Sequence, residues 1–251
     1  MVGIIAMLLA LLMPAFARAR RQSRTLVCMS NLRQLGMAFA IHVAEHKGQT
    51  LKAEGEVFDD GPLELEPLLV RDRQREDSGV MFCPEATEFG PQFQAGSYNF
   101  HLGTVDHCWA IPTSTNPGPN PVYKSSSYGM NNWVSRIRSL GYGDRYGKGE
   151  MFIDPGAKRA DSVPLFGDAV YPACIPMEND PPPSDLRVPV PDGKPLPLIG
   201  TSMRLFCIAR HGRSINIVFL DGHAETVRLE DLWRLRWNSK FVPRSVTLPL
   251  Y

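Results

Sequence analysis

The sequence predicts an α+β fold in which one long N-terminal helix packs against an antiparallel β-sheet. Between Ala15 and His46 the only helix-weakening residue is Gly36, and apolar residues recur there at helical spacing. After Gly48 the pattern changes to short apolar segments between turns, in a chain that holds 22 prolines and 21 glycines. The segment 214–220, SINIVFL, has the strongest strand pattern and ends at an Asp-Gly pair.

Length and charge limit the classes of function. The 251 residues make one large domain or two small ones, and we divide the chain into an assembly helix (1–48) and a globular α+β domain (49–251). Lys and Arg (27) nearly balance Asp and Glu (26), so we expect no nucleic-acid partner.

The first predicted element begins with an uninterrupted apolar run, 2–16. Fifteen helical residues span about 22 Å, which is less than the roughly 30 Å of a bilayer core. A signal peptide, a buried helix and a membrane anchor whose first turns precede Met1 are the alternatives. We favour the anchor, because arginines follow the run and no basic residue precedes it. Its residues include Val2, Ile5, Leu8, Leu12 and Pro14.

The helix is expected to continue as an amphipathic segment to residue 46. Its apolar stripe comprises Cys28, Leu32, Leu35, Phe39 and Val43, and Lys47-Gly48 is typical of a C-terminal stop. Pro14 removes one backbone hydrogen bond and should bend the helix.

Shorter elements follow. We expect a strand at 162–170, strand or turn at 126–134, a short apolar segment at 79–86 and a flexible glycine-rich loop at 141–150. The segment 172–197 holds nine prolines, which cannot donate backbone hydrogen bonds, and is predicted to be an extended surface loop.

The stretch 210–225, RHGRSINIVFLDGHAE, gathers residue types of a metal or hydrolytic site. Asp221-Gly222 predicts a two-residue type I′ hairpin loop, with Leu220 opposite His223. His211 then lies about 33 Å from Asp221 along a straight strand, whereas a catalytic pair needs a contact of about 3 Å. A sharp fold back at Gly212 would shorten this gap without obviously closing it. We therefore predict a structural hairpin and no His211–Asp221 dyad.

Other candidate ligands are scattered, and we predict no catalytic, cofactor or metal site. Calcium held by loop carboxylates is the alternative, but no local motif supports it. The carboxylates considered for calcium are Asp59, Asp60, Asp161 and Asp168. For other metals we consider three groups, namely His42 with His46, Cys207 with His211, and His101 with His107 and Cys108. Trp109, Trp133, Trp233 and Trp237 are expected in the core rather than on a sugar-binding surface.

Several short stretches together resemble one protein class. These stretches are the apolar helix followed by CMSNLRQLG, then FCPE, SYGMN, FGDA and a C-terminal His211-X9-Asp221-Gly222 segment. The combination is similar to type IV pilin-like proteins and type II secretion pseudopilins, in particular the DUF1559-like group with a prepilin-type N-terminus. The family's cleavage-site segment, with its aromatic residue and glutamate, is not in this sequence.

The resemblance implies a pilin-like fold and a structural or assembly subunit, not an enzyme, of a type II secretion or type IV pilus-like envelope system. Its partners are then the lipid bilayer and other pilin-like subunits, reached through the N-terminal helix. The implied location is the bacterial inner membrane, single-pass, with an extracytoplasmic globular part. The positive-inside rule conflicts with this orientation, because basic residues directly after the apolar run would hold residues 17 onward in the cytoplasm. These residues are Arg18, Arg20, Arg21 and Arg24. The alternative function is a membrane-anchored extracytoplasmic protein that binds a glycan or envelope partner and does not polymerise.

Five cysteines lie far apart without a C-x-x-C motif. Cys28, on the stripe that should face the sheet, and Cys83, in FCPE, are the possible disulfide; two buried thiols are the alternative. The bond would close a loop of roughly 55 residues and join the helix to the globular part.

Overall fold

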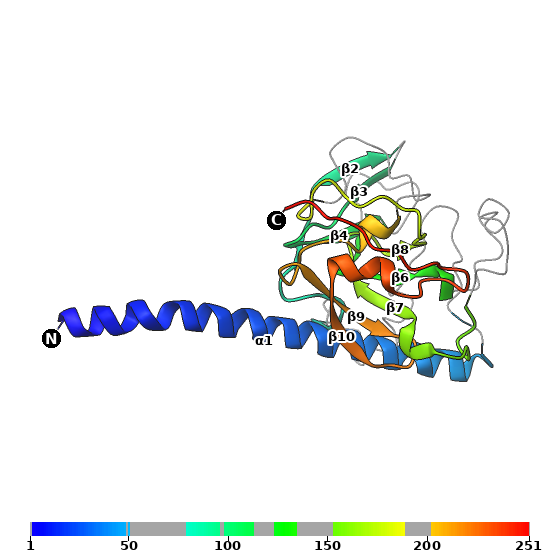
Figure 1. Ribbon diagram of the computed structural model, residues 1–251, viewed down its shortest axis with the longest axis horizontal. Helices are drawn as coiled ribbons and strands as arrows, with labels where there is room; N and C mark the ends of the chain where they lie inside the picture. The colour runs from blue at the N-terminus through cyan, green and yellow to red at the C-terminus, as the bar shows by residue number, and fades with distance from the viewer. Residues whose placement is uncertain are drawn as a thin grey trace.

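The computed structural model describes residues 2–48, 50, 79–95, 98–112, 123–134, 153–188 and 202–250. It shows the predicted α+β fold, with one long helix, α1 (Val2–Glu45), packed against antiparallel sheets. The C-terminal half of α1 runs along the globular part, and its N-terminal half projects away from it (Figure 1). The expected glycine-rich loop at 141–150 lies outside the described residues.

The bounds and buried face of α1 confirm the sequence pattern. Cys28, Leu32, Leu35 and Phe39 are buried, and Val43 packs partly buried against the same core. The helix ends as predicted: Lys47 and Gly48 have positive φ, and the Gly48 amide donates to the Val43 carbonyl at 2.8 Å. The helix continues through Pro14 as one element.

The sheet beside α1 has the strand order β10-β9-β7-β6-β8. Its strands are β6 (Tyr128–Asn131), β7 (Pro164–Asp168), β8 (Ala173–Cys174), β9 (Ser214–Phe219) and β10 (Ala224–Arg228). Neighbours are antiparallel except the parallel pair β6–β8. Gly36 allows α1 to approach β9 closely, because a Cβ atom there would lie 2.9 Å from Val218 Cγ2.

A second sheet lies farther from the helix (Figure 1). It comprises β1 (Glu88–Phe89), β2 (Gln92–Ala95), β3 (Tyr98–His101), β4 (His107–Pro112) and β5 (Tyr123–Ser126). The central strand β4 pairs with β3 and β5 in antiparallel fashion and with β1 in parallel. Short 3-10 helices complete the described elements: η2 (Gly79–Met81), η3 (Asn132–Val134), η4 (Ala160–Ser162), η5 (Ser202–Leu205) and η6 (Leu229–Arg234).

The β9–β10 hairpin exists, but its predicted loop and register are wrong. Val218 pairs with Ala224 and Asn216 with Thr226. The Phe219 amide donates to the His223 carbonyl and the Gly222 amide to the Phe219 carbonyl, which leaves a three-residue loop. Only Gly222 in this loop has a positive φ, so the turn is a type I turn followed by a left-handed glycine rather than type I′.

The proline-rich segment is also corrected. Residues 172–188 are not an extended surface loop, because β8 pairs with β6 there and Cys174, Asp180 and Leu186 are buried. The two residues of β8, Ala173 and Cys174, are not prolines, so they can join the sheet. Residues 189–197 lie outside the described part of the chain.

The core confirms the prediction for the aromatic residues. All four tryptophans are buried, and each indole N–H that donates a hydrogen bond does so to a backbone carbonyl. The tryptophans therefore pack the interior of the globular part and do not form a surface platform for sugars.

Candidate functional site

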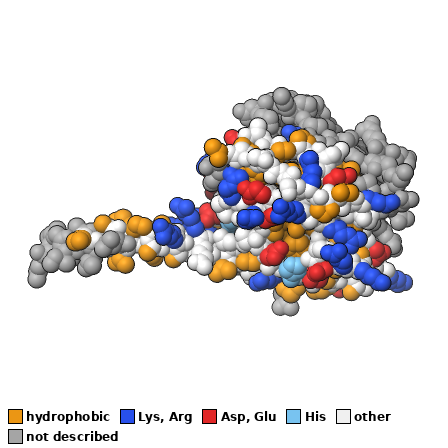
Figure 2. All heavy atoms as spheres, viewed as in Figure 1, with side chains coloured by type: hydrophobic (Ala, Val, Ile, Leu, Met, Phe, Trp, Pro, Cys, Tyr) orange, Lys and Arg blue, Asp and Glu red, His pale blue; other side chains and the backbone are white. Residues whose placement is uncertain are grey.

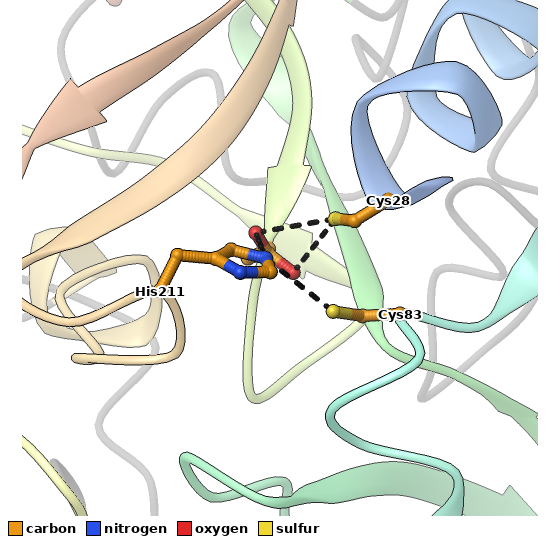
Figure 3. Close-up of side chains that lie close together, drawn as sticks. Cys28, Cys83 and His211 are labelled. Carbon is orange, nitrogen blue, oxygen red and sulfur yellow. Dashed lines mark hydrogen bonds and ion pairs between the residues drawn. The ribbon is translucent and has the colours of Figure 1, made fainter. Parts of the chain in front are cut away.

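Four side chains with metal-ligating atoms meet beneath the helix. Cys28, Cys83, Asp168 and His211 place one sulfur, oxygen or nitrogen atom each within 4.8 Å of all the others. Cys28 comes from α1, Cys83 from a loop and His211 from a turn on the opposite side (Figure 3). We call these four residues the Cys-Cys-Asp-His cluster.

Local structure positions each member. Cys28 lies on the buried stripe of α1, and Asp168 is the last residue of β7. The Asn31 side-chain amide, one helical turn after Cys28, donates to the Gly79 and Phe82 carbonyls and holds the loop that carries Cys83 against the helix.

His211 reaches the cluster because the chain turns sharply before β9. Gly212 has a φ of 73°, and the His211 amide donates to the Ser214 carbonyl. The straight strand assumed from the sequence between His211 and Asp221 therefore begins only at Ser214. The turn directs His211 towards α1, while Asp221 stays at the hairpin loop and pairs with His223 at 2.6 Å.

The interatomic distances within the cluster are short and similar. Cys28 Sγ lies 3.6 Å from both Asp168 carboxylate oxygens, and Cys83 Sγ lies 3.4 Å from His211 Nε2. His211 Nε2 lies 3.3 Å from Asp168 Oδ2. Cys28, Cys83 and Asp168 have no exposed surface, and the side chain of His211 is 3 % exposed.

Thr25 fixes the tautomer of His211. The Thr25 hydroxyl donates to the Arg21 carbonyl one turn earlier in α1, so its oxygen accepts from His211 Nδ1, 3.1 Å away. With a proton on Nδ1, the neutral imidazole has its lone pair on Nε2, the nitrogen that faces the two thiols and Asp168.

Asp168 is held from the opposite side. The Asn216 amide donates to Oδ2 at 2.9 Å, and Arg210 Nη1 lies 3.2 Å from Oδ1. Arg210 is itself buried, and its guanidinium donates to several carbonyls, including those of Ser127 and Thr104. The carboxylate is therefore fixed in orientation and paired with a buried cation.

Without a bound ion these groups shift one another's pKa values. Burial raises the pKa of Asp168, but the charges of His211 and Arg210 outweigh it and lower the pKa to about 2. Burial lowers the pKa of His211, but the Asp168 charge outweighs it and raises the pKa to about 10. Burial raises the pKa of Cys28, yet hydrogen bonds from Cys83 and His211 lower it to about 7. Burial, followed by the hydrogen bond with Cys28, raises the pKa of Cys83 far above its usual range.

The arrangement differs from a nucleophilic triad. In such a triad the carboxylate binds one imidazole nitrogen and the nucleophile faces the other. Here Asp168 and Cys83 share Nε2, while Thr25 occupies Nδ1. A buried set of two sulfurs, one nitrogen and one oxygen instead matches the ligand types of a closed structural metal site.

Of the other residues considered as metal ligands, only Asp168 and His211 belong to this cluster. His42 and His46 stack on each other at 4.0 Å, His101 binds the Gly90 carbonyl, and His107 binds Asp106. Cys108 and Cys207 are buried free thiols. Of the calcium candidates, Asp168 faces sulfur and nitrogen atoms, Asp161 has no place in the cluster, and Asp59 and Asp60 lie outside the described residues.

The possible disulfide also involves this cluster. Cys28 and Cys83 lie together as expected, within 4.8 Å, and both are free thiols in this structure. Sequence reasoning connected neither Asp168 nor His211 with these two cysteines. A usable signal was present, because the stretches CMSNLRQLG, FCPE, FGDA and the His211 segment each supply one member.

The expected anchor residues Val2, Ile5, Leu8, Leu12 and Pro14 all lie in α1. Leu12 is 61 % exposed. Across the described ranges, no helix combines the length and apolar character required to traverse a bilayer.

Comparisons with known proteins give no relative: no family model, no curated protein and no solved structure matches the chain.

Proposed function

We propose that the protein is a pseudopilin-like structural or assembly subunit of a type II secretion or type IV pilus-like envelope system. The observation that carries the proposal is the division of α1 into two halves. The projecting half includes the exposed residues 12–23, and the docked half runs from Arg24 to Glu45 along the globular part. The projecting half presents an apolar surface that no other described part of the chain covers, and this surface is the proposed contact with lipid and with other subunits.

Side-chain exposure defines the projecting half. Residues 12–23 are all exposed, and Leu12, Met13 and Phe16 are 61 %, 67 % and 74 % exposed. Figure 2 shows apolar side chains along this segment and Lys and Arg side chains where it meets the globular part. Removing such side chains from water is favourable at about 25 cal/mol per Å², so an apolar partner surface stabilises the segment.

The docked half supports the same proposal because it fixes the direction of the projecting half. Arg24, the first partly buried residue of α1 after the projecting segment, pairs with Glu85 at 2.8 Å. Asn216 donates from β9 to the Thr25 carbonyl at 3.0 Å. A rigidly mounted helix gives every subunit the same geometry, as a repeating assembly requires.

Photo-crosslinking in bacterial membranes tests the proposal. A benzophenone amino acid replaces Phe16 in the full-length chain, and a control chain carries it at Val242, which is 64 % exposed on the globular part. We expect a ladder of homo-oligomers from position 16 and none from position 242. Phe16→Asp with the probe at Met13 should remove the ladder while the thermal transition of the globular part stays unchanged.

Two results would contradict assembly. Crosslinks from position 16 to lipid alone, with a strictly monomeric protein, would favour the membrane-anchored binding protein. Recovery of the chain entirely outside the membrane fraction, also without a ladder, would exclude both functions.

A further inference from the structure

We propose that Cys28, Cys83, Asp168 and His211 bind one structural zinc ion, which joins α1 to the globular part. This site is independent of the proposed assembly function. It is argued from the ligand types, the distances between ligand atoms, the local charge and the groups around the ligands.

The distances match a tetrahedral zinc site. Zinc bonds of about 2.3 Å to sulfur and about 2.0–2.1 Å to nitrogen or oxygen, at tetrahedral angles, place sulfur about 3.5–3.6 Å from nitrogen or oxygen, and nitrogen about 3.3–3.4 Å from oxygen. The observed separations are 3.6 Å for Cys28 Sγ to Asp168 Oδ2, 3.4 Å for Cys83 Sγ to His211 Nε2 and 3.3 Å for Nε2 to Oδ2. Each observed separation agrees with the tetrahedral value within about 0.2 Å.

The local charges favour a divalent cation. Two thiolates and one carboxylate bring three negative charges into the interior, where unpaired charge is costly. A zinc ion compensates two of these charges, and the buried guanidinium of Arg210 beside Asp168 compensates the third. Ligation replaces the protons on the thiols and the proton on His211 Nε2, and these protons leave to solvent as the Zn–S and Zn–N bonds form.

The surrounding groups orient the ligands as in known metal sites, where the second nitrogen of a histidine ligand is hydrogen-bonded. Thr25 occupies His211 Nδ1 and leaves the Nε2 lone pair for the metal. Asp168 Oδ2 faces the cluster while Arg210 holds Oδ1. Sulfur and imidazole ligands select zinc over the oxygen-preferring calcium and magnesium ions.

Four protein ligands leave no coordination position for water, so the site has a structural role. The ligands come from α1, from the loop after η2, from β7 and from the turn before β9. One ion thus connects the helix to three separate segments of the globular part. It replaces the disulfide between Cys28 and Cys83 as the expected link.

Metal analysis of the full-length protein, purified in detergent without a histidine tag, is the first test. We expect one zinc per chain in the wild type and in Cys174→Ala, and at least a tenfold loss of bound zinc in Cys83→Ala. Cys174 is the matched control because it is also a buried free thiol, but it lies outside the cluster. Equal zinc content in Cys83→Ala and the control would overturn the proposal.

X-ray absorption on the wild-type protein does not depend on how the variants fold. The expected coordination is two sulfurs at about 2.3 Å and two nitrogen or oxygen atoms at about 2.0–2.1 Å. Coordination without sulfur, or a protein that takes up no Zn²⁺ on titration, would overturn the proposal. So would a Cys28–Cys83 disulfide, seen by mass spectrometry as the loss of two hydrogens.

Thr25 is tested as a positioning residue. Thr25→Val keeps the shape but removes the acceptor for His211 Nδ1, and we expect zinc affinity to fall about 10–100-fold. Thr25→Ser keeps the hydroxyl group and should bind zinc with the affinity of the wild type. Affinity measured by competition with a chelating dye separates this role from packing, because a purely structural role of Thr25 would change stability and leave the affinity unaltered.

Discussion

The two halves of α1 share one continuous backbone and differ in what surrounds them. In the docked half, Leu32 and Leu35 have no exposed surface. In the projecting half, Leu12 and Phe16 are exposed by 61 % and 74 %. Apolar side chains are therefore common to both halves, and tertiary packing is the difference between them.

This difference assigns separate roles to separate stretches of sequence. The docked half contributes to the stability of the globular part, because its removal exposes the sheet. The projecting half contributes little to that stability, so its apolar residues need another explanation, which the proposed assembly surface provides. Matched substitutions in the two halves test this division.

The largest contrast is expected between Leu35→Ala and Leu12→Ala. Deleting a buried leucine side chain leaves a cavity and costs about 2–5 kcal/mol, whereas an exposed position changes stability by less than about 0.5 kcal/mol. Urea unfolding of the globular part, followed by tryptophan fluorescence, measures both. Equal losses would mean that the two halves unfold as one packed unit.

Asn31→Ala should give the next largest effect in the docked half. The change leaves the Gly79 and Phe82 carbonyls without their side-chain donor, and we expect a loss of about 1–3 kcal/mol. Ser23→Ala, at an exposed position of the projecting half, is the control and should be neutral. Hydrogen exchange at 79–83 should also quicken in Asn31→Ala; unchanged exchange there would refute the proposed hold on this loop.

Gly36→Ala tests the close approach of α1 to β9. The added methyl group would meet Val218 Cγ2 at 2.9 Å, and overpacking of this kind costs about 1–3 kcal/mol, against roughly 1 kcal/mol gained in helix propensity. We expect a net loss in the wild type. In a Val218→Ala background the same change should stabilise the protein. A loss of the same size in both backgrounds would show that Val218 is not the obstacle.

Arg24→Gln, at the border between the halves, should have the smallest effect. Its ion pair with Glu85 is partly exposed, with 35 % and 22 % side-chain exposure, and such pairs contribute roughly 0–1 kcal/mol. Thermal unfolding at low and high salt measures it. The difference between variant and wild type should shrink as salt screens the pair.

The sequence was most informative where the signal is periodic. The buried stripe of α1 and the core strand β9 follow from the spacing of apolar residues, because one buried face imposes a period on the sequence. The end of α1 follows from a residue type, the glycine of Lys47-Gly48. The hairpin register was missed because Asp-Gly is compatible with more than one turn, and Phe219 pairs with His223 only in the three-residue loop. For 172–188, the high number of prolines predicted a loop, although two residues that are not prolines, Ala173 and Cys174, join the sheet.

The Cys-Cys-Asp-His cluster could not be predicted from spacing. Its members come from four segments far apart in the chain, so no local motif joins them. The straight strand assumed for 211–221 correctly separated His211 from Asp221. A fold back at Gly212 was weighed only for that pair, whereas the turn there brings His211 to Cys83 and Asp168. Tertiary geometry, rather than any pattern along the chain, determines this site.

The position of Cys28 has a mechanical consequence. It is the first fully buried residue of α1 after the projecting half, so tension applied to that half enters the globular part close to it. A zinc ion bound there would divide the force among the helix, β7 and two loops at once, and the helix would not peel from β9 one side chain at a time. Resistance to pulling would then depend on metal supply, and single-molecule extension with and without a chelator would measure that dependence.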